Sequence, residues 1–315
     1  MARILITGGA GCLGSNLVER YLSQGHDVLV IDNFATGSRA ALPRSPGFIL
    51  VEGSIADDGL VRRAFGDFEP THVIHGAAAY KDPTDWREDA STNVLGTIHV
   101  VEAARRGGVR RLVNLQTALC YGRPDRVPIP VDHPCRPVTS YGISKTTGEA
   151  YIALSGLPYA SLRLANIVAP RLAIGPIPTF YKRLKAGQRC FCTDAVRDFL
   201  DISDFLAFMN LALRDDGPTG VFNVSTGVGH TIKDVFDAVA AHVGVVPVEP
   251  VPIVPPEPDD VPALVLDPSR ARATFGWQAE IGFAETIARM LAWYDAHGIT
   301  DIHSHLASPA GSGSA

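Results

Sequence analysis

Residues 8–14 read GGAGCLG, follow an apolar run at residues 3–7 and begin a helical pattern. A glycine-rich turn between a strand and a helix is where a dinucleotide pyrophosphate binds, because the helix N-terminus attracts negative charge. We expect Gly8 to form the tight turn, Gly11 to let the backbone approach the pyrophosphate, and Gly14 to allow close helix packing. The stretch therefore predicts a nucleotide-binding strand–turn–helix unit.

Asp32 follows the second apolar run, at residues 27–31. In a unit of this kind, a carboxylate at the end of the second strand accepts hydrogen bonds from the adenosine ribose hydroxyls and repels a 2′-phosphate. The position of Asp32 therefore favours NAD over NADP as the cofactor.

Short apolar runs alternate with helical patterns through the first half of the chain. The runs are rich in valine, isoleucine and leucine, as is typical of parallel strands that are covered on both faces. In chain order, the expected strands and helices span residues 3–7, 13–24, 27–31, 48–52, 59–65, 71–75, 90–106, 111–116, 140–155 and 159–164. This order predicts an α/β fold with a doubly wound parallel sheet.

The pattern changes after about Arg171, and 315 residues exceed what one core usually supports. Helices are predicted at residues 175–185, 232–242 and 283–294, and the proline-dense residues 245–262 are expected to be extended strand and loop. We expect residues 1–170, joined again by 199–225, to form the nucleotide-binding domain. Residues 171–198 and 226–305 would form a smaller mixed α/β lobe, and the small, polar residues 306–315 a disordered tail.

Composition and charge exclude several classes of protein. The net charge of −5 and the pI of about 6.0 are unlike those of proteins that bind nucleic acid or an anionic membrane surface. No apolar stretch has the length of a membrane span, and no signal peptide precedes the first apolar run. Five scattered cysteines are typical of reduced thiols, so we expect a cytoplasmic protein.

Two short pairs of possible metal ligands are incomplete. Cys190 and Cys192 lie in a stretch predicted to be a strand, residues 189–193, where alternation places both on one face. His303 and His305 lack further ligands nearby. We therefore expect no metal site.

Tyr141 and Lys145 lie four residues apart on a predicted helix, so both project from one face. A nearby ammonium group, helped by the positive nicotinamide of NAD, would lower the pKa of the tyrosine by favouring the phenolate. Tyr141 would then take a hydroxyl proton while a hydride leaves for NAD. Thr117 follows the fifth strand, at the sheet edge where ligands bind, and would donate to the reacting oxygen.

From Met1 to about Tyr294 the chain resembles the extended short-chain dehydrogenases/reductases that modify nucleotide sugars, the galactose epimerase-like epimerase/dehydratase family. This resemblance implies a Rossmann domain and a nucleotide-sugar-binding lobe. The segments that carry it, besides the glycine-rich turn and the Tyr141–Lys145 pair, are DNFATG at residues 32–37, HGAAA at 75–79, NVLGT at 93–97, RLAN at 163–166, RDF at 197–199, NVS at 223–225 and FGW at 275–277.

The resemblance also implies the roles of further residues. It identifies as cofactor-binding Gly8, Gly11, Cys12, Leu13, Gly14, Asp32, Asn33, Thr36, Gly37, Ser54, Ile55, Ala77, Ala78, Ala79, Asn93, Tyr141 and Lys145. It identifies as substrate-binding Lys81, Thr117, Asn166 and Arg197. The helices at residues 90–106 and 140–155 would form a four-helix homodimer interface.

Three departures from the family pattern bear on the reaction. Ala118 and Leu119 stand where dehydratases of the family carry an acid for elimination, which favours simple oxidation and reduction at carbon 4. Ser54 replaces an aspartate that meets the adenine amino group. Glu257 stands near the usual position of an arginine that binds the diphosphate, which leaves Arg197, with Lys182 or Arg183, to balance the phosphates.

These features predict an NAD-dependent nucleotide-sugar 4-epimerase, with a UDP-sugar as the favoured substrate and a 4-keto intermediate. The alternative enzymes are a nucleotide-sugar 4,6-dehydratase and a 4-ketoreductase. A non-catalytic NAD-binding regulator on the same fold is the alternative from another class. The nucleotide, the sugar and the pathway stay open at this point.

Overall fold

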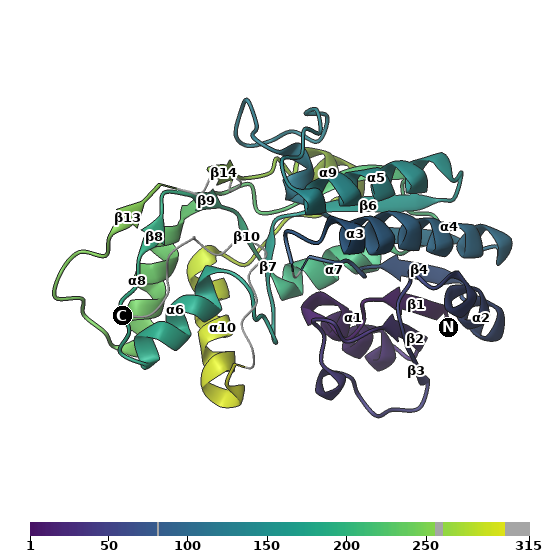
Figure 1. Ribbon diagram of the computed structural model, residues 1–315, viewed down its shortest axis with the longest axis horizontal. Helices are drawn as coiled ribbons and strands as arrows, with labels where there is room; N and C mark the ends of the chain where they lie inside the picture. Colours follow the sequence, from purple (N-terminus) through teal and green to yellow (C-terminus); the bar gives the residue numbers. More distant parts are fainter. Residues whose placement is uncertain (81, 256–260, 300–315) are drawn as a thin grey trace.

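The computed structural model describes residues 1–80, 82–255 and 261–299. They form a larger part built on a parallel sheet and a smaller part in which α6, α8 and α10 pack together (Figure 1). The helices are α1 (Cys12–Ser23), α2 (Asp58–Phe68), α3 (Trp86–Asp89), α4 (Thr97–Arg106), α5 (Ser140–Leu154), α6 (Pro176–Lys185), α7 (Ile202–Ala212), α8 (Ile232–Val243), α9 (Ser269–Phe275) and α10 (Phe283–His297), with the shorter turns η1 (Arg39–Ala41), η2 (Ala90–Gly96) and η3 (Ala118–Tyr121).

Within these residues, the main sheet has seven strands, each parallel to its neighbours, in the order β11-β6-β5-β4-β1-β2-β3. Its strands are β1 (Arg3–Thr7), β2 (Asp27–Asp32), β3 (Phe48–Glu52), β4 (His72–His75), β5 (Arg111–Thr117), β6 (Tyr159–Leu164) and β11 (Gly220–Val224). The strand order reverses between β1 and β4, which is where such folds bind nucleotides. The predicted doubly wound parallel sheet is confirmed.

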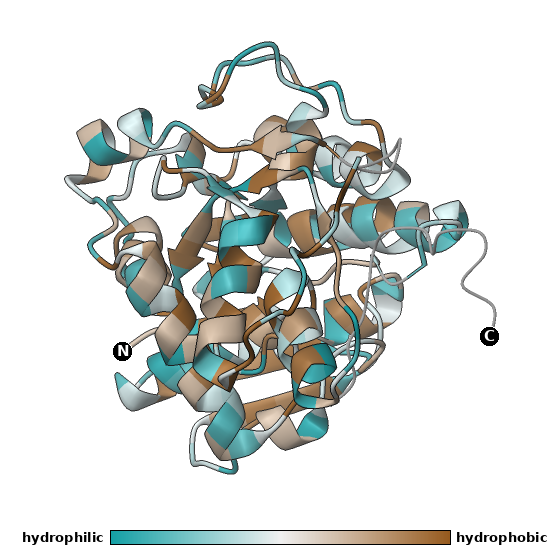
Figure 2. Ribbon diagram, turned by 90° about the vertical axis from the view of Figure 1, so that its left-hand side faces the viewer, coloured by the Kyte–Doolittle hydropathy of each residue, from teal (hydrophilic) through white to brown (hydrophobic). Residues whose placement is uncertain are grey.

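Helices cover both faces of this sheet because successive side chains of its strands point to opposite faces and are apolar on both. Ile4 and Ile6 of β1 belong to a core that includes residues of α1 and α7. Leu5 belongs to the opposite core, with residues of α2, α4 and α5. In Figure 2 the hydrophobic strands accordingly lie in the interior, between helices that show both colours.

The helix predicted at residues 90–106 differs from the structure at its start. It begins earlier, at Trp86, and continues through the π-helical turns of η2 before α4. Asp85 caps the start by accepting a hydrogen bond from the amide of Glu88 at 3.0 Å. Wide π turns occur mostly at functional sites, and this one contains Asn93.

The smaller part combines three helices with short strand pairs. Two short strands, β7 (Asn166–Val168) and β10 (Phe199–Asp201), connect it to the main sheet. Its own short strands are β8 (Cys192–Thr193), β9 (Val196–Arg197), β12 (His230–Thr231), β13 (Ile253–Val254) and β14 (Ala263–Leu264). Between the two parts, β7 pairs with β10, and the chain then returns through α7 to β11 at the edge of the main sheet.

Some features predicted from the sequence differ or lie elsewhere. Only Cys192 lies in a strand, where it is buried, while Cys190 precedes the strand and is partly exposed, so the two do not share one strand face. No cluster of potential metal ligands exists among the described residues. In the same part of the chain, no helix is long and apolar enough to cross a membrane. Lys81, Glu257, the pair His303 and His305, and residues 306–315 lie outside the described residues.

Candidate active site

The glycine-rich turn joins β1 to α1 and is shaped by close backbone contacts. Gly8 has a φ of +72°, and its amide donates to the carbonyl oxygen of Ile31 at 2.8 Å. A Cβ at Gly14 would lie 2.2 Å from the Gly8 carbonyl oxygen, whereas a Cβ at Gly11 would meet nothing closer than 3.4 Å. Gly14 therefore permits tight packing of the helix on the turn, and the space at Gly11 lets a phosphate approach the backbone.

The N-terminus of α1 suits an anion. Its N-cap is Gly11, and among the described residues no side chain caps the helix and no acidic residue lies in its first turn. The first backbone N–H groups, from Cys12 and Leu13, have no partner within the helix, and the helix dipole makes this end positive. The turn and the helix end therefore fit the pyrophosphate of a dinucleotide.

Asp32 ends β2 beside this turn and is nearly buried. Its two carboxylate oxygens accept hydrogen bonds from the amides of Ala10 and Phe34, each at 2.8 Å. These bonds hold the carboxylate at the carboxyl edge of the sheet. Because each oxygen can accept a second bond, the group retains the capacity to bind ribose hydroxyls.

The loop after β2 packs directly on the glycine-rich turn. A Cβ at Gly37 would lie 2.8 Å from Ala10, so only a glycine permits this approach. Within the loop, the side chain of Asn33 accepts a hydrogen bond from the amide two residues ahead, and Thr36 accepts one from the hydroxyl of Tyr80 at 3.4 Å. The three predicted cofactor residues of this loop therefore lie along one wall of the site.

Ser54 and Ile55 follow β3 in the next turn along the sheet edge. The Ser54 hydroxyl accepts a hydrogen bond from the amide of Ala56 at 3.1 Å, so it supports the turn. Ile55 is buried against Gly96, where a Cβ would lie only 2.7 Å from its side chain. Ile55 is therefore chiefly a packing residue, and Ser54 offers a hydroxyl where the family pattern has a carboxylate.

A buried chain of hydrogen bonds starts at the carboxyl end of β4. The Thr7 hydroxyl accepts bonds from the amides of Gly76 and Ala77, so its own proton points to Nδ1 of His75, 2.9 Å away. Nε2 of His75 then carries the ring proton and donates to the Thr97 hydroxyl at 2.9 Å, which in turn donates to the backbone carbonyl of Asn93.

Asn93 continues this chain to the catalytic helix. Its side chain accepts from the amide of Ala79 and donates to the Ala79 carbonyl and to the hydroxyl of Ser144. That hydroxyl donates to the backbone carbonyl of Tyr141 at 3.0 Å. The predicted cofactor segment 77–79 is therefore fastened to α5, and the sequence missed His75 as the group that joins it to β1.

Tyr141 lies in the first turn of α5, whose start is fixed by Thr139 accepting a hydrogen bond from the amide of Gly142. Burial raises the pKa of Tyr141 above its ordinary value, as do the charges of Tyr80 and Asp89, while a hydrogen bond with the Thr117 hydroxyl lowers it. Thr117 and Tyr141 thus meet at the carboxyl end of β5.

Lys145 lies one turn further along α5 and is buried. Its ammonium group donates to the backbone carbonyl of Leu115 in β5 at 2.9 Å. Burial lowers the pKa of Lys145 to about 8, while Glu149 raises it. Two ammonium protons stay available for a further acceptor such as a ribose hydroxyl.

Asp89 is a buried carboxylate near Tyr141 that the sequence analysis did not identify. Its Oδ2 has no hydrogen-bond partner among residues 1–80, 82–255 and 261–299. Burial raises the pKa of Asp89, with a hydrogen bond from Ser140 acting in the opposite direction. An acidic run from Asp82 to Asp89 was visible in the sequence, but nothing there distinguished the one member that is buried.

The segment after Thr117 carries no acid. Ala118 is buried and Leu119 packs against it, in an apolar cluster that includes Ile129 and Leu266. A carboxylate at either position would be desolvated by these neighbours. The structure therefore places apolar side chains where dehydratases of this type carry their acid.

Of the predicted substrate residues, Asn166 and Arg197 lie on short strands outside the main sheet, Thr117 ends β5, and Lys81 lies outside the described residues. Asn166 is exposed at the start of β7, and Arg197 ends β9 half-buried, with its guanidinium donating to the carbonyls of Val196 and Pro262. Arg163 of the same sequence motif as Asn166 is buried in an ion pair with Glu149 at 2.6 Å, so it stabilises the interior.

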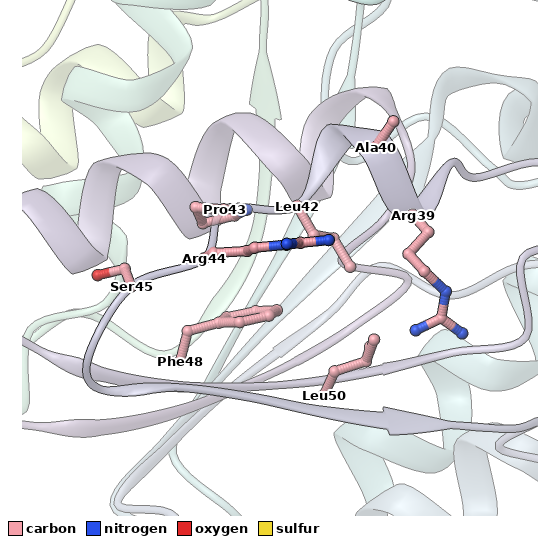
Figure 3. A pocket seen from close by; sticks show the side chains of 8 residues that line it. All are labelled: Arg39, Ala40, Leu42, Pro43, Arg44, Ser45, Phe48 and Leu50. Atoms are coloured by element: carbon pink, nitrogen blue, oxygen red, sulfur yellow. The ribbon is translucent and has the colours of Figure 1, made fainter.

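A surface pocket lies at the β3 edge of the main sheet, apart from the predicted catalytic residues. It is formed by η1, the loop that follows and β3, with Arg39, Arg44 and Phe48 in its walls (Figure 3). The described residues that line this pocket do not include Thr117, Tyr141 or Lys145. Thr117 and Tyr141 meet at the carboxyl end of β5 and Lys145 lies one turn further along α5, so these residues mark the candidate active site.

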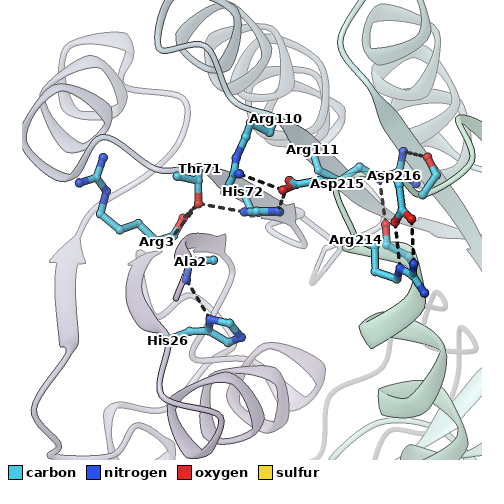
Figure 4. A network of polar contacts seen from close by, with 12 residues as sticks. Ala2, Arg3, His26, Thr71, His72, Arg110, Arg111, Arg214, Asp215 and Asp216 are labelled. Carbon is cyan, nitrogen blue, oxygen red and sulfur yellow. Dashed lines mark hydrogen bonds and ion pairs between the residues drawn. The ribbon is translucent and has the colours of Figure 1, made fainter.

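The opposite, amino end of the sheet is closed by charge pairs (Figure 4). Asp215 bridges Nε2 of His72 at 3.0 Å and the guanidinium of Arg110 at 2.8 Å. Arg111 is fully buried and donates to three backbone carbonyls of the chain between α7 and β11. This end therefore holds the fold together and offers no comparable set of groups for catalysis.

Known proteins resemble this chain in sequence and in fold. A UDP-glucose 4-epimerase of Mycolicibacterium smegmatis is 33% identical over 313 residues, covering 93% of this chain and 98% of the relative. The crystal structure of the Bordetella bronchiseptica enzyme WbmG in complex with NAD has a TM-score of 0.93 and 65% identity, covering 97% of this chain and 98% of that one. Another crystal structure of WbmG contains NAD and UDP, with a TM-score of 0.92, 64% identity and coverage of 96% and 97%.

A dehydratase shares the same fold at lower identity. DesIV, a dTDP-glucose 4,6-dehydratase from Streptomyces venezuelae, has a TM-score of 0.83 and 26% identity, covering 94% of this chain and 97% of that one. The profile of the NAD dependent epimerase/dehydratase family matches residues 4–225, which include the glycine-rich turn, Asp32, Thr117, Tyr141 and Lys145. This chain therefore belongs to the NAD dependent epimerase/dehydratase family.

Proposed function

We propose that the protein is a nucleotide-sugar 4-epimerase that acts on a UDP-sugar. The observation that carries this proposal is the meeting of Thr117 and Tyr141 at the carboxyl end of β5, beside an apolar Ala118–Leu119 segment. When NAD takes the hydride, oxidation of an alcohol needs only a base for its proton, the role proposed for Tyr141, whereas elimination of water also needs an acid for the leaving hydroxyl. The relative named UDP-glucose 4-epimerase and the WbmG complex with UDP support the choice of substrate.

Each catalytic side chain has one task in this reaction. Bound NAD supplies a hydride acceptor that later returns the hydride to carbon 4. The positive nicotinamide of bound NAD would favour the phenolate of Tyr141, which would accept the proton of the sugar 4-hydroxyl and give it back after the keto sugar has turned. Thr117 orients the reacting oxygen, and Lys145 holds the nicotinamide ribose through the ammonium protons that Leu115 leaves available.

The cofactor path follows the carboxyl edge of the main sheet. Gly8, Gly11 and Gly14 leave room for the pyrophosphate, and Asp32 binds the adenosine ribose. The other proposed NAD contacts are Cys12, Leu13, Asn33, Thr36, Gly37, Ser54, Ile55, Ala77, Ala78, Ala79 and Asn93. Residues 77–79 would contact the nicotinamide end of NAD, because Asn93 links this segment by hydrogen bonds to α5, which carries Tyr141.

The substrate would bind between the two parts of the chain. We assign residues 1–170 and 199–225 to the NAD-binding domain and residues 171–198 and 226–305 to the lobe that binds the nucleotide sugar. The return of β11 to the main sheet supports this division. Asn166, Arg197 and Lys81 are the proposed contacts to the substrate, with Arg197 balancing diphosphate charge.

The enzyme would act as a homodimer through α4 and α5. Ile143, Tyr151 and Leu154 are exposed by 53%, 41% and 80%. Their spacing places them along one side of α5, and Leu95 of η2 adds a further exposed apolar side chain. A second copy that covers this apolar stripe would remove it from water. Light scattering of the purified protein tests the proposal, which fails if the mass equals one chain.

The enzyme would work in the cytoplasm. Its five cysteines all lie in the described part of the chain and are unbridged, which suits a reducing compartment. Fractionation of the source cells tests this assignment.

A product assay separates the proposed reaction from its rivals. The protein is incubated with NAD and a panel of UDP-, TDP-, CDP- and GDP-sugars, and the products are analysed by mass spectrometry and NMR. An epimerase converts its substrate into an isomer of unchanged mass with carbon 4 inverted. Loss of one water would identify a 4,6-dehydratase, and net reduction of NAD with formation of a 4-keto sugar of otherwise unchanged composition would identify a 4-ketoreductase running in reverse. Binding of NAD without turnover of any sugar would favour the non-catalytic regulator.

A further inference from the structure

Two cysteines, Cys120 and Cys135, lie together next to the catalytic residues. Cys120 is fully buried in η3, three residues after Thr117, and belongs to an apolar cluster against which the partly exposed Cys135 also packs. The two cysteines are fifteen positions apart in the chain, but the segments that carry them are in backbone contact. A Cβ at Gly122 would lie only 1.9 Å from the carbonyl oxygen of Arg136. The fold therefore holds two thiols side by side.

The two thiols differ in exposure and in ionisation. A hydrogen bond from the Cys120 thiol lowers the pKa of Cys135; burial acts against this effect, and the charge of Arg163 adds to it. Burial raises the pKa of Cys120, which therefore stays protonated. Because the thiolate and not the thiol reacts with oxidants, Cys135 is the residue that an oxidant attacks first. Cys120 then lies beside it as the second thiol that a disulfide needs.

We propose that Cys120 and Cys135 form a redox site, at which hydrogen peroxide produces a reversible disulfide that slows turnover; the effect on turnover rests on the proposed function. The Cys135 thiolate attacks one peroxide oxygen, so that an S–O bond forms, the O–O bond breaks, and hydroxide leaves and takes up the proton that Cys135 had lost. The Cys120 sulfur then attacks the sulfenic sulfur of Cys135, and the S–O bond breaks as the hydroxyl group leaves with the Cys120 proton as water. The two thiols lose two electrons in total, and the peroxide is reduced to two molecules of water.

The disulfide changes the segment between the catalytic groups. It holds its two sulfurs about 2.05 Å apart, closer than two hydrogen-bonded thiols, so η3 and the segment at Cys135 must shift toward each other. The Leu119 carbonyl oxygen lies 3.0 Å from where a Cβ at Gly142 would be, so a shift of η3 reaches the first turn of α5. That turn contains Tyr141, and Thr117 is the N-cap of η3. Since a displacement of about 1 Å can cost a hundredfold in rate, we expect the disulfide to lower turnover about tenfold.

The test reads the disulfide and the turnover separately. Reduced, NAD-loaded protein is treated with graded hydrogen peroxide, free thiols are blocked, and tryptic peptides are analysed by mass spectrometry. Trypsin cuts after Arg126, between the two cysteines, so the disulfide joins residues 112–126 to residues 127–145. We expect the wild type to yield these joined peptides and to lose epimerisation of the preferred UDP-sugar about tenfold. Dithiothreitol should restore both the free thiols and the turnover.

Three variants assign the order of the steps. Cys135→Ser should keep the turnover of the reduced wild type and resist peroxide, because Cys120 is buried away from the oxidant. Cys120→Ala should stop at the sulfenic acid of Cys135, which dimedone traps. Cys190→Ser is the matched control, since it removes another partly exposed thiol, in the smaller part, and should stay as sensitive to peroxide as the wild type. Circular dichroism establishes that each variant is folded, and Cys135→Ala replaces Cys135→Ser if the serine variant is not.

Several results would overturn the proposal. One is oxidation of Cys12 or Cys190 in the wild type without the joined peptides. Another is a disulfide that leaves turnover unchanged, and a third is a loss of activity that persists in folded Cys135→Ser.

The disulfide is read from mass alone, which separates this proposal from the proposed function. If no UDP-sugar is epimerised, the proposed function fails, while the joined peptides still establish the redox site. Isomer formation by the wild type without any joined peptides refutes the redox site alone.

Discussion

Two buried histidines at opposite ends of β4 show how differently the two ends of the sheet are built. His72, at the amino end, faces the carboxylate of Asp215, which offsets part of the lowering of its pKa by burial. His75, at the carboxyl end, meets only the hydroxyls of Thr7 and Thr97, and burial lowers its pKa to about 3, with the charge of Lys145 adding to the effect.

The same contrast holds for the charged groups around them. At the amino end, the guanidinium of Arg111 donates to three carbonyls, and Asp215 has two basic partners. At the carboxyl end, the groups near the catalytic helix retain capacity to bind: Lys145 uses one of its protons in the protein, and Asp89 has an oxygen without a partner among the described residues. One end stabilises the sheet, while the other keeps polar groups ready for ligands.

Replacing Tyr141 by phenylalanine should have the largest effect. Removal of the proton-accepting hydroxyl is expected to lower the rate of epimerisation by about a hundredfold to ten thousandfold, with the fold and NAD binding retained. Steady-state kinetics with the preferred UDP-sugar measures this. Tyr151→Phe removes a phenol oxygen from an exposed position of the same helix and should keep wild-type turnover. Comparable rates for the Tyr141 variant would remove Tyr141 from the mechanism.

Replacing Arg111 by methionine should destabilise the amino end of the main sheet. It leaves three backbone carbonyls without their donor, so the free energy of unfolding should fall by about 3 kcal/mol while turnover of the folded protein stays unchanged. Urea unfolding measures the loss. Arg110→Met, which removes a half-exposed ion pair, should cost less than about 1 kcal/mol. Equal losses in the two variants would contradict the contrast between buried and exposed pairs.

Gly14→Ala alters the carboxyl end through the backbone. The new Cβ would lie 2.2 Å from the Gly8 carbonyl oxygen, so α1 must shift, and we expect a loss of about 2 kcal/mol in the free energy of unfolding together with weaker NAD binding. Chemical denaturation and NAD titration measure both effects. Gly66→Ala in α2, where a Cβ meets nothing within 4 Å, should stabilise the protein by about 0.5–1 kcal/mol. Unaltered NAD affinity in Gly14→Ala would show that the turn tolerates a side chain.

A pH series has the smallest expected effect. Because the folded-state pKa of His75 is lowered to about 3, the unfolded chain binds a proton below about pH 6.5 that the folded protein excludes. The stability from this group is therefore present above pH 6.5 and is lost as the pH falls toward 3. Between pH 6.5 and 5.5 the loss should be about 1 kcal/mol. The measurement is the slope of unfolding free energy against pH, which should be shallower in His75→Asn than in the wild type. Parallel slopes would mean that His75 is not the responsible group.

The sequence alone predicted the doubly wound sheet, because its strands are buried on both faces and show it as continuous apolar runs. It also predicted that the glycine-rich turn, Asp32, Thr117 and Tyr141 lie at one edge, because all of them follow parallel strands or begin the next helix. Local spacing carries such information, since turns, caps and helix faces depend on residues close together in the chain.

Only the tertiary structure revealed which polar groups are buried and which partners they meet. Four such features depend on segments far apart in the sequence. They are the hydrogen bond from Lys145 to Leu115, the hydrogen bonds of His75 to β1 and α4, the Asp89 oxygen that has no partner among the described residues, and the contacts of Tyr80 with Thr36 and Tyr141. The burial that raises the pKa of Tyr141 in the protein without NAD was likewise not visible in the sequence. Helix periodicity places two side chains on one face, but desolvation and the nearest charges are set by the surrounding chain.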